Sequence, residues 1–419
     1  MGPGGRADQP PPPGTSGQPQ PSQKSLRGLD WFIFCVADVQ TGFGPFIAVY
    51  LTSQKWTQID IGLILTVSGL VALVGQIPGG MLVDRARSER LVAGLSLIAI
   101  ATSAIIYASF PIFAAILVAA VVHALASCVL GPCIAAISLG LVGHTKLAER
   151  LGRNARFASV GNGLAAASMG TVGYFFSPQA VFVVTALLAA PTLFALSQIS
   201  ATEINPERAH GGPNTEEKKP SISFRQLLQH RSLLALGACL ILFHLANAAL
   251  LPLMGTVVTM RSSEWATVLI GACIVVPQII VAVIAPSVGS LSRNWGSRTL
   301  LLIGVGVLPI RALLFAFVSN PYLIVVVQIL DGLTAAIIGV IVPLMVADLT
   351  RGSGRFNTGL GVTGTMSGIG ASLSPTLGGL MADHLGNTAA FLGLGTIGAI
   401  ALLAVWALIP ETKRGNNLN

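Results

Sequence analysis

The sequence predicts an all-α integral membrane protein whose twelve transmembrane helices form two pseudo-symmetric six-helix bundles. The first reason is composition, because 53% of the 419 residues are hydrophobic, 10% are charged, and the mean hydropathy is +0.76. A soluble domain has roughly a quarter of its residues charged, so a soluble fold is excluded. The second reason is that apolar segments of about twenty to thirty residues, long enough to cross a bilayer as helices, recur along the chain. The third is that the two halves of the chain resemble each other.

Short polar connections separate the apolar segments, and one longer polar break divides them into two groups of six. We predict spans over residues 29–52, 59–83, 91–108, 112–141, 157–176, 179–199, 233–256, 266–290, 299–318, 322–348, 358–382 and 389–409. The corresponding domains are a tail over 1–28, an N-terminal bundle over 29–199, a central loop over 200–232, a C-terminal bundle over 233–409 and a tail over 410–419. The Pro-, Gly- and Gln-rich start of the chain predicts that the first tail is disordered.

The basic residues predict the orientation of these spans. Of the 24 Lys and Arg residues, 21 lie in the two tails and the even-numbered connections, whereas Lys55 and Arg261 lie on the other side and Arg311 lies inside a span. Basic loops stay in the cytoplasm, so we predict a multi-pass protein of the plasma membrane (the inner membrane of a Gram-negative cell) with both termini cytoplasmic. The net charge of +8 therefore belongs to membrane loops, and we expect no nucleic-acid partner.

The halves match at an offset of 209 residues, which predicts two copies of one unit in parallel orientation. The matching pairs are Trp56 with Trp265, Ile61 with Ile270, Gly62 with Gly271, and Gly80 with Gly289. This arrangement is typical of transporters whose two bundles rock about a substrate site near the bilayer midplane.

The connection after the second span, residues 80–90, reads GMLVDRARSER. It resembles the loop signature of the major facilitator superfamily, although Arg87 stands where that family usually has a second Gly. In the repeat of this segment, residues 289–298, both glycines are present but Arg293 replaces the Asp. The resemblance covers residues 29–413 and implies the superfamily fold, alternating access, and a gating loop built from Gly80, Asp84, Arg85, Arg90, Gly289 and Arg298. A Gly lets two helices approach, and an Asp at a helix end can cap a neighbouring helix or pair with Arg.

Ionisable side chains inside membrane spans are costly and are therefore functional candidates. The proton-coupling candidates are Asp38, His123, His244 and Asp331, on helices that line the central cavity in the superfamily fold. Burial would raise the pKa of a carboxyl group such as Asp38 into a range where it can load and release a proton. The alternatives are a structural Asp38, neutral histidines bonded to backbone or water, and a structural ion pair between Asp331 and Arg311.

Neutral amides in equivalent helices indicate where a polar solute would bind. Gln40 and Asn247 occupy the same position relative to Pro45 and Pro252, in the first and seventh spans. We predict that these two amides bind substrate together with Asp38 and His244.

These features predict a proton-coupled secondary transporter for a small organic solute, working as a monomer, with a preference for efflux. The chain has no Walker-type phosphate loop, so we expect a gradient to supply the energy and expect neither a cofactor nor an enzymatic activity. One alternative is a carrier of a transition metal or metal chelate that uses Asp38, His123 and His244 with Cys35 or Cys239. A second is a membrane receptor with a transporter fold.

Overall fold

The computed structural model describes residues 21–41, 44–212, 223–261, 266–318 and 320–410, and all regular elements within these ranges are helices. The predicted tail over 410–419 falls almost wholly outside them. The predicted disorder over 1–28 is wrong at its end, because α1 already begins at Gln23. The side chain of Ser22 caps this start by accepting a hydrogen bond from the backbone of Ser25.

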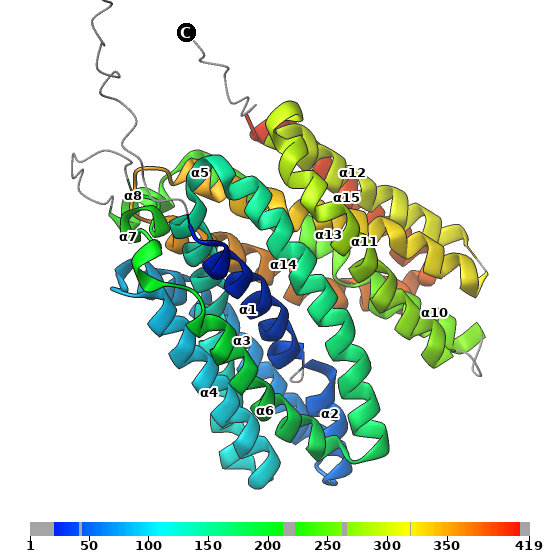
Figure 1. Cartoon of the computed structure of the whole chain (residues 1–419). Coiled ribbons are helices and arrows are strands. Elements are labelled where there is room, and N and C mark those ends of the chain that lie inside the picture. The colour runs from blue at the N-terminus through cyan, green and yellow to red at the C-terminus, as the bar shows by residue number, and fades with distance from the viewer. Residues whose placement is uncertain (1–20, 42–43, 213–222, 262–265, 319, 411–419) are drawn as a thin grey trace, which may run out of the picture.

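The helices divide into a first and a second bundle (Figure 1). The first bundle contains α1 (Gln23–Thr41), α2 (Gly44–Ser53), α3 (Gln58–Arg85), α4 (Glu89–Ser109), α5 (Phe113–Phe175) and α6 (Pro178–Ser197). The second contains α9 (Arg231–Asn247), α10 (Leu250–Arg261), α11 (Ala266–Trp295), α12 (Ser297–Phe317), α13 (Pro321–Leu349), α14 (Phe356–Leu385) and α15 (Asn387–Leu408). The short helices η1 (Ala201–Glu203), α7 (Pro206–Ala209) and α8 (Phe224–Leu228) lie between the two bundles in sequence.

These helices account for the twelve predicted crossings. Nine described helical segments are long and apolar enough to span a membrane, and α5 is one of them although it makes two crossings. Its two parts meet at Gly143, whose φ of 69° and ψ of 174° interrupt the helix. The first crossing is shared by α1 and α2, and α14 is rich in Gly, Ser and Thr, which lowers its hydropathy.

Each bundle has its own apolar core. In the first, Tyr50, Tyr107 and Phe182 are fully buried in one aromatic cluster, and the Tyr50 hydroxyl donates to the Tyr107 carbonyl at 2.7 Å. In the second, Phe315 and Phe391 pack against each other. Large apolar side chains such as Leu403, Leu187 and Phe194 remain exposed on the outside of the bundles, as a lipid-facing surface requires.

The bundles meet along two helix pairs, α3 with α14 and α5 with α11. At Gly80 a Cβ atom would collide with the carbonyl oxygen of Asn357, and at Gly289 it would collide with that of Ala148. Gly289 lies 209 residues after Gly80, and Ala148 lies 209 residues before Asn357, so the two contacts are equivalent in the repeat. Glycine is therefore required at both positions for the helices to approach this closely.

The same symmetry holds one turn further along. A Cβ atom at Gly361 would collide with the carbonyl oxygen of Gln76, and one at Gly152 with that of Ala285. These contacts are again related by 209 residues. The repeat read from the sequence thus appears in space as two equivalent contacts between the bundles.

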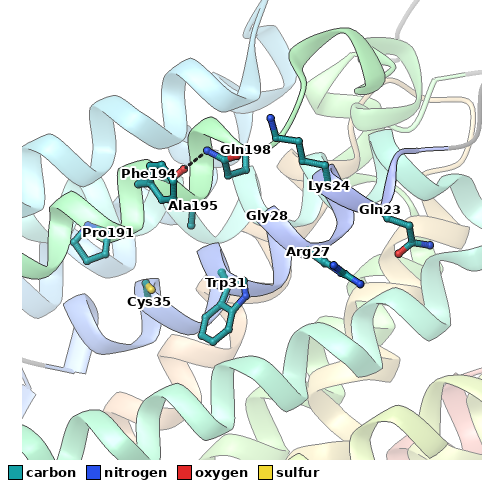
Figure 2. A pocket seen from close by; sticks show the side chains of 10 residues that line it. All are labelled: Gln23, Lys24, Arg27, Gly28, Trp31, Cys35, Pro191, Phe194, Ala195 and Gln198. Carbon is teal, nitrogen blue, oxygen red and sulfur yellow. Dashed lines mark hydrogen bonds between the residues drawn. The ribbon is translucent and has the colours of Figure 1, made fainter.

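Both close contacts lie at the end of the molecule where α3 ends and α7 and α8 lie, close to the start of α1 and the end of α15 (Figure 1). We call it the basic end, because Arg85, Lys146 and Arg293 mark it. A cavity of about 640 Å³ opens between α1 and α6 near this end (Figure 2).

Candidate functional site

Asp84 lies in the last turn of α3 and holds the first turn of α14. Its Oδ1 atom accepts hydrogen bonds from the backbone nitrogen of Asn357 at 3.0 Å and from the side-chain amide at 2.9 Å. Its Oδ2 atom accepts from the backbone nitrogen and the hydroxyl of Thr358, at 2.7 and 2.5 Å. One carboxylate from the first bundle therefore binds four donors of the second bundle, and we call this contact the Asp84 latch.

The local sequence explains why α14 needs this carboxylate. The first backbone N–H groups of any helix lack partners within the helix. At the N-cap position of α14, the Arg355 side chain makes no capping hydrogen bond, so the helix has no cap of its own. A carboxylate at a helix N-terminus also interacts favourably with the helix dipole. The missing cap of α14 is thus supplied across the interface, and it is lost when the bundles separate at this end.

The repeat-related position carries the opposite charge. Arg293 of α11, which corresponds to Asp84, forms an ion pair with Glu149 of α5, which corresponds to Thr358. We call this contact the Arg293 latch. Both side chains are about half exposed, at 44% and 49%, so the pair contributes at most about 1 kcal/mol. In the sequence, Arg293 stands where the family motif has an Asp, and in the structure this arginine makes a contact of different chemistry between the bundles.

The central connection adds a third contact, which we call the central strap, residues 204–212. Phe356 donates its backbone N–H to the His210 carbonyl at 3.1 Å, and the Asn357 amide donates to the Ala209 carbonyl at 3.2 Å. The His210 ring lies 3.0 Å from the buried carboxylate of Glu89, in the first bundle. The segment predicted as a polar loop is therefore folded against the start of α14, beside the Asp84 latch.

The predicted gating arginines have different surroundings. Arg85 is exposed at the end of α3. Arg90 donates to the carbonyl of Ile199 at 2.7 Å, and Arg298 donates to that of Trp406 at 2.6 Å. The Arg90 bond lies within the first bundle and the Arg298 bond lies within the second. Each satisfies a carbonyl near the end of a neighbouring helix. These two arginines stabilise helix ends, one in each bundle.

The Arg293 latch gives a prediction of moderate size. The substitution Arg293→Glu places two carboxylates together, and we expect it to shift the equilibrium between the closed and open basic end about five- to tenfold toward open. Adding Glu149→Arg restores opposite charges and should restore the wild-type equilibrium. The measurement is the alkylation rate of a cysteine at Ile77, which packs into the interface, in a chain without native cysteines. If the double variant is alkylated as fast as Arg293→Glu alone, the pair of Arg293 and Glu149 does not hold the bundles together at this end.

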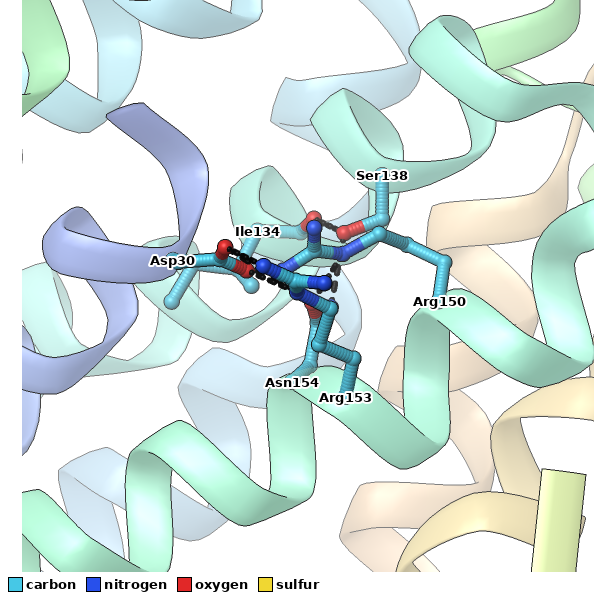
Figure 3. Close-up of polar contacts among 6 residues, drawn as sticks. All are labelled: Asp30, Ile134, Ser138, Arg150, Arg153 and Asn154. Carbon is cyan, nitrogen blue, oxygen red and sulfur yellow. Dashed lines mark hydrogen bonds and ion pairs between the residues drawn. The ribbon is translucent and has the colours of Figure 1, made fainter. Parts of the chain in front are cut away.

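A buried polar cluster joins α1 to α5 at the same end (Figure 3). The Asp30 carboxylate accepts from Arg150 at 2.6 Å and from two nitrogens of Arg153, at 2.5 to 3.0 Å. Arg150 also donates to Asn154 at 2.5 Å, and the Asn154 amide donates to Ser138 at 2.8 Å. Since Ser138 precedes and Asn154 follows the break at Gly143, the cluster fixes both parts of α5 against α1.

The structure brings three of the predicted intramembrane residues together in the second bundle. Arg311 of α12 forms an ion pair with Asp331 of α13 and donates to the Asn247 side chain of α9 at 2.9 Å. The guanidinium group is buried and also lies over the Phe315 ring, 5.3 Å from its centroid. Asn247, predicted to bind substrate, is thus engaged by Arg311 and links three helices.

The other predicted residues are spread over both bundles. His123 of α5 lies 3.5 Å from the Ser127 hydroxyl, one turn away, and His244 of α9 packs edge-on against Phe243. Gln40 is half-buried in α1. Asp38 lies in the same helix, but its side chain is outside the part that the structure describes. Among the described residues, no three His, Cys, Asp or Glu side chains form a group that could hold a metal ion.

Sequence reasoning missed Asp30, Glu149, Thr358 and the central strap. Asp30 stands next to the predicted start of the first span, and its partners follow 120 and 123 residues later. The offset of 209 residues could have found the Arg293 partner, because it carries the α14 start onto Ala148 and Glu149.

The family model described as Major Facilitator Superfamily matches residues 30–321 and 270–419. The chain is 38% identical over 395 residues to an MFS-type transporter of Mycobacterium tuberculosis, recorded in strains CDC 1551 and H37Rv, covering 92% of this chain and 93% of the relative. A further MFS-type transporter of strain H37Rv is 27% identical over 124 residues, 29% of this chain and 21% of that protein.

Among solved structures, the human organic anion transporter MFSD10 (TETRAN) is similar with a TM-score of 0.70. The match covers 91% of this chain and 99% of that chain, at 15% sequence identity. At this identity the likeness establishes a shared fold. It does not extend to the solute that is carried.

Proposed function

We propose, because this chain belongs to the Major Facilitator Superfamily, that it exports a small organic solute by alternating access and is driven by protons. Family membership makes it a multi-pass transmembrane transporter. The solute class, the coupling ion and the direction are our proposal, as is the cytoplasmic location of the basic end.

The observation that carries this proposal is the pair of repeat-related contacts at the basic end. The Asp84 latch and the Arg293 latch lie on the two helix pairs where the bundles meet, and neither contact is covalent. Alternating access requires an equilibrium between a closed and an open end, so the contacts must be stable yet breakable. A carboxylate that caps a helix of the other bundle meets this requirement.

Proton coupling is supported by the ionisable residues within the spans. Asp38 is our first candidate, because a carboxyl group in a membrane helix is costly unless it is protonated or paired. The Arg311 ion pair and its bond to Asn247 instead give Asp331 a positioning role, holding α9, α12 and α13 together.

The test is untargeted profiling of small molecules in cells and medium, comparing wild type with Asp38→Asn, each with and without a protonophore. We expect a compound that wild-type cells export only while the proton gradient is intact, and that Asp38→Asn cells retain. The substitution Asp60→Asn, at a partly buried acid in the first turn of α3 and far from the Asp84 latch, is the control and should export normally. If export by the wild type persists with the protonophore, proton coupling is wrong.

A further inference from the structure

The cavity between α1 and α6 has a charged end and an apolar end. Four side chains at the basic end are polar or charged, and the cavity then continues along apolar groups (Figure 2). The polar side chains are Gln23, Lys24 and Arg27 of α1 and Gln198 at the end of α6, and the apolar part is lined mainly by Trp31 and Phe194. A phospholipid has the same arrangement, with a charged headgroup followed by apolar acyl chains.

The sequence of α1 creates this surface. Lys24, Gly28, Trp31 and Cys35 recur every three or four residues, so they share one face of the helix. At Gly28 a Cβ atom would lie 3.0 Å from the Cβ of Gln198, so the chain approaches the end of α6 closely there. From Lys24 to Cys35 the helix rises roughly 16 Å, about half the thickness of the hydrocarbon core.

The two cations of the cavity are available to an outside ligand. Neither Lys24 nor Arg27 forms an ion pair with any residue that the structure describes, and both are exposed. The Glu203 carboxylate at this end is instead engaged by Ser22, which donates its backbone nitrogen at 2.8 Å and its hydroxyl at 3.1 Å. The positive charge of the cavity is therefore complementary to an anion.

The apolar part of the cavity is lined by exposed side chains. Trp31 is 56% exposed and Phe194 is 68% exposed, in a chain whose family spans the membrane. Trp side chains favour the membrane interface, and basic pockets between transmembrane helices on the cytoplasmic side suit anionic lipid headgroups. A soluble anion would leave the Trp31 and Phe194 surface unfilled.

We propose that the cavity between α1 and α6 binds one anionic phospholipid of the cytoplasmic leaflet. Lys24 and Arg27 bind its phosphate, and its acyl chains lie along Trp31, Pro191 and Phe194. The assignment to the cytoplasmic leaflet rests on the proposed function, whereas the binding chemistry does not. Since α1 also carries Asp30, the bound lipid contacts the helix that the polar cluster fixes to α5.

The test uses the full chain with Trp31 as its single Trp, the other four being replaced by Phe, in phosphatidylcholine vesicles. Brominated phosphatidylglycerol is added in increasing mole fraction and quenching of Trp31 is recorded. We expect saturable quenching at a mole fraction at least tenfold lower than with brominated phosphatidylcholine. Because each basic group near an anionic surface strengthens binding about fivefold, Lys24→Gln with Arg27→Gln should remove most of this preference.

The matched control is Arg87→Gln with Arg225→Gln, which removes two exposed charges of the basic end outside the cavity and should leave the preference intact. Equal quenching by both lipids, or a preference that survives loss of Lys24 and Arg27, would overturn the proposal. A truncated chain that lacks residues 1–20 is a further test. If both lipids quench Trp31 equally in this chain, the lipid preference depends on the tail, and the proposal is wrong. Native mass spectrometry of the wild-type chain gives a second readout. Neither readout depends on transport. Failure of the lipid proposal can therefore be distinguished from failure of the proposed function.

Discussion

Asp84→Asn opens the basic end of the protein and abolishes most of its transport. The carboxylate accepts four hydrogen bonds from Asn357 and Thr358, and an amide would turn an NH2 group toward two of these donors. Hydrogen bonds to a charged group contribute about 1.5–3 kcal/mol each, and the helix dipole adds up to ~2 kcal/mol. A net loss of about 3 kcal/mol corresponds to a shift of roughly 100-fold toward the open basic end.

The measurement is alkylation of a cysteine at Ile77, in a background without native cysteines, by a water-soluble maleimide that reaches the basic end. We expect a much faster reaction in Asp84→Asn than in Arg293→Glu, because the Asp84 latch is the stronger contact. Solute affinity should stay within a few-fold, since Asp84 lies at the gate. The control, Asp60→Asn, changes an acid at the opposite end of the same helix, where it accepts from Thr57 at 2.7 Å. Equal alkylation rates in Asp84→Asn and Asp60→Asn would show that Asp84 does not hold the basic end closed.

Asp30→Asn should lower the stability of the first bundle more than any other single change proposed for the polar cluster. Asp30 and Arg150 are almost fully buried, with 3% and 4% of their side chains exposed. Removing one partner leaves a buried guanidinium without its counter-ion, which costs about 3–5 kcal/mol. By the usual scaling this lowers the melting temperature by roughly 10 °C.

The control for this prediction is Arg153→Gln in the same cluster. Arg153 is 55% exposed, so its loss should cost no more than about 1 kcal/mol. Thermal unfolding in detergent, followed with a thiol-reactive dye, reports the exposure of buried residues such as Cys133 and Cys239. Equal melting temperatures for Asp30→Asn and Arg153→Gln would show that the buried ion pair adds nothing to stability.

Much of the fold could be predicted from the sequence because it depends on periodic or repeated features. The number and length of the apolar segments determine the number of membrane crossings. Gly80 and Gly289, which match in the repeat, indicate positions where two helices approach closely. The segment at Asp84 could be found because it lies in one continuous stretch that resembles the loop signature of the family. The pair of Arg311 and Asp331 was accessible because two opposite charges at similar depth in neighbouring spans are costly apart.

The remaining features depend on distant partners. Nothing near Asp30 indicates that Arg150 will approach it, because the two meet only after α5 reverses direction at Gly143. The Arg355 side chain has only hydrogen-bond donors and cannot cap its own helix, but nothing near Asp84 in the sequence indicates that it will supply the missing cap. The central strap was predicted as a loop because its composition is polar. Its contacts with α14 are mostly made by backbone atoms, which carry no sequence signal.

The central claim is that two repeat-related contacts hold the basic end closed in an equilibrium with an open form. Its most direct test is a distance measurement by double electron–electron resonance between spin labels at Arg87 and Arg351, exposed on opposite sides of the gate. In a background without native cysteines we expect a predominantly short distance, and a shift to a longer one when Asp84→Asn is combined with Arg293→Glu. A distance distribution that stays the same in the double variant would contradict the account.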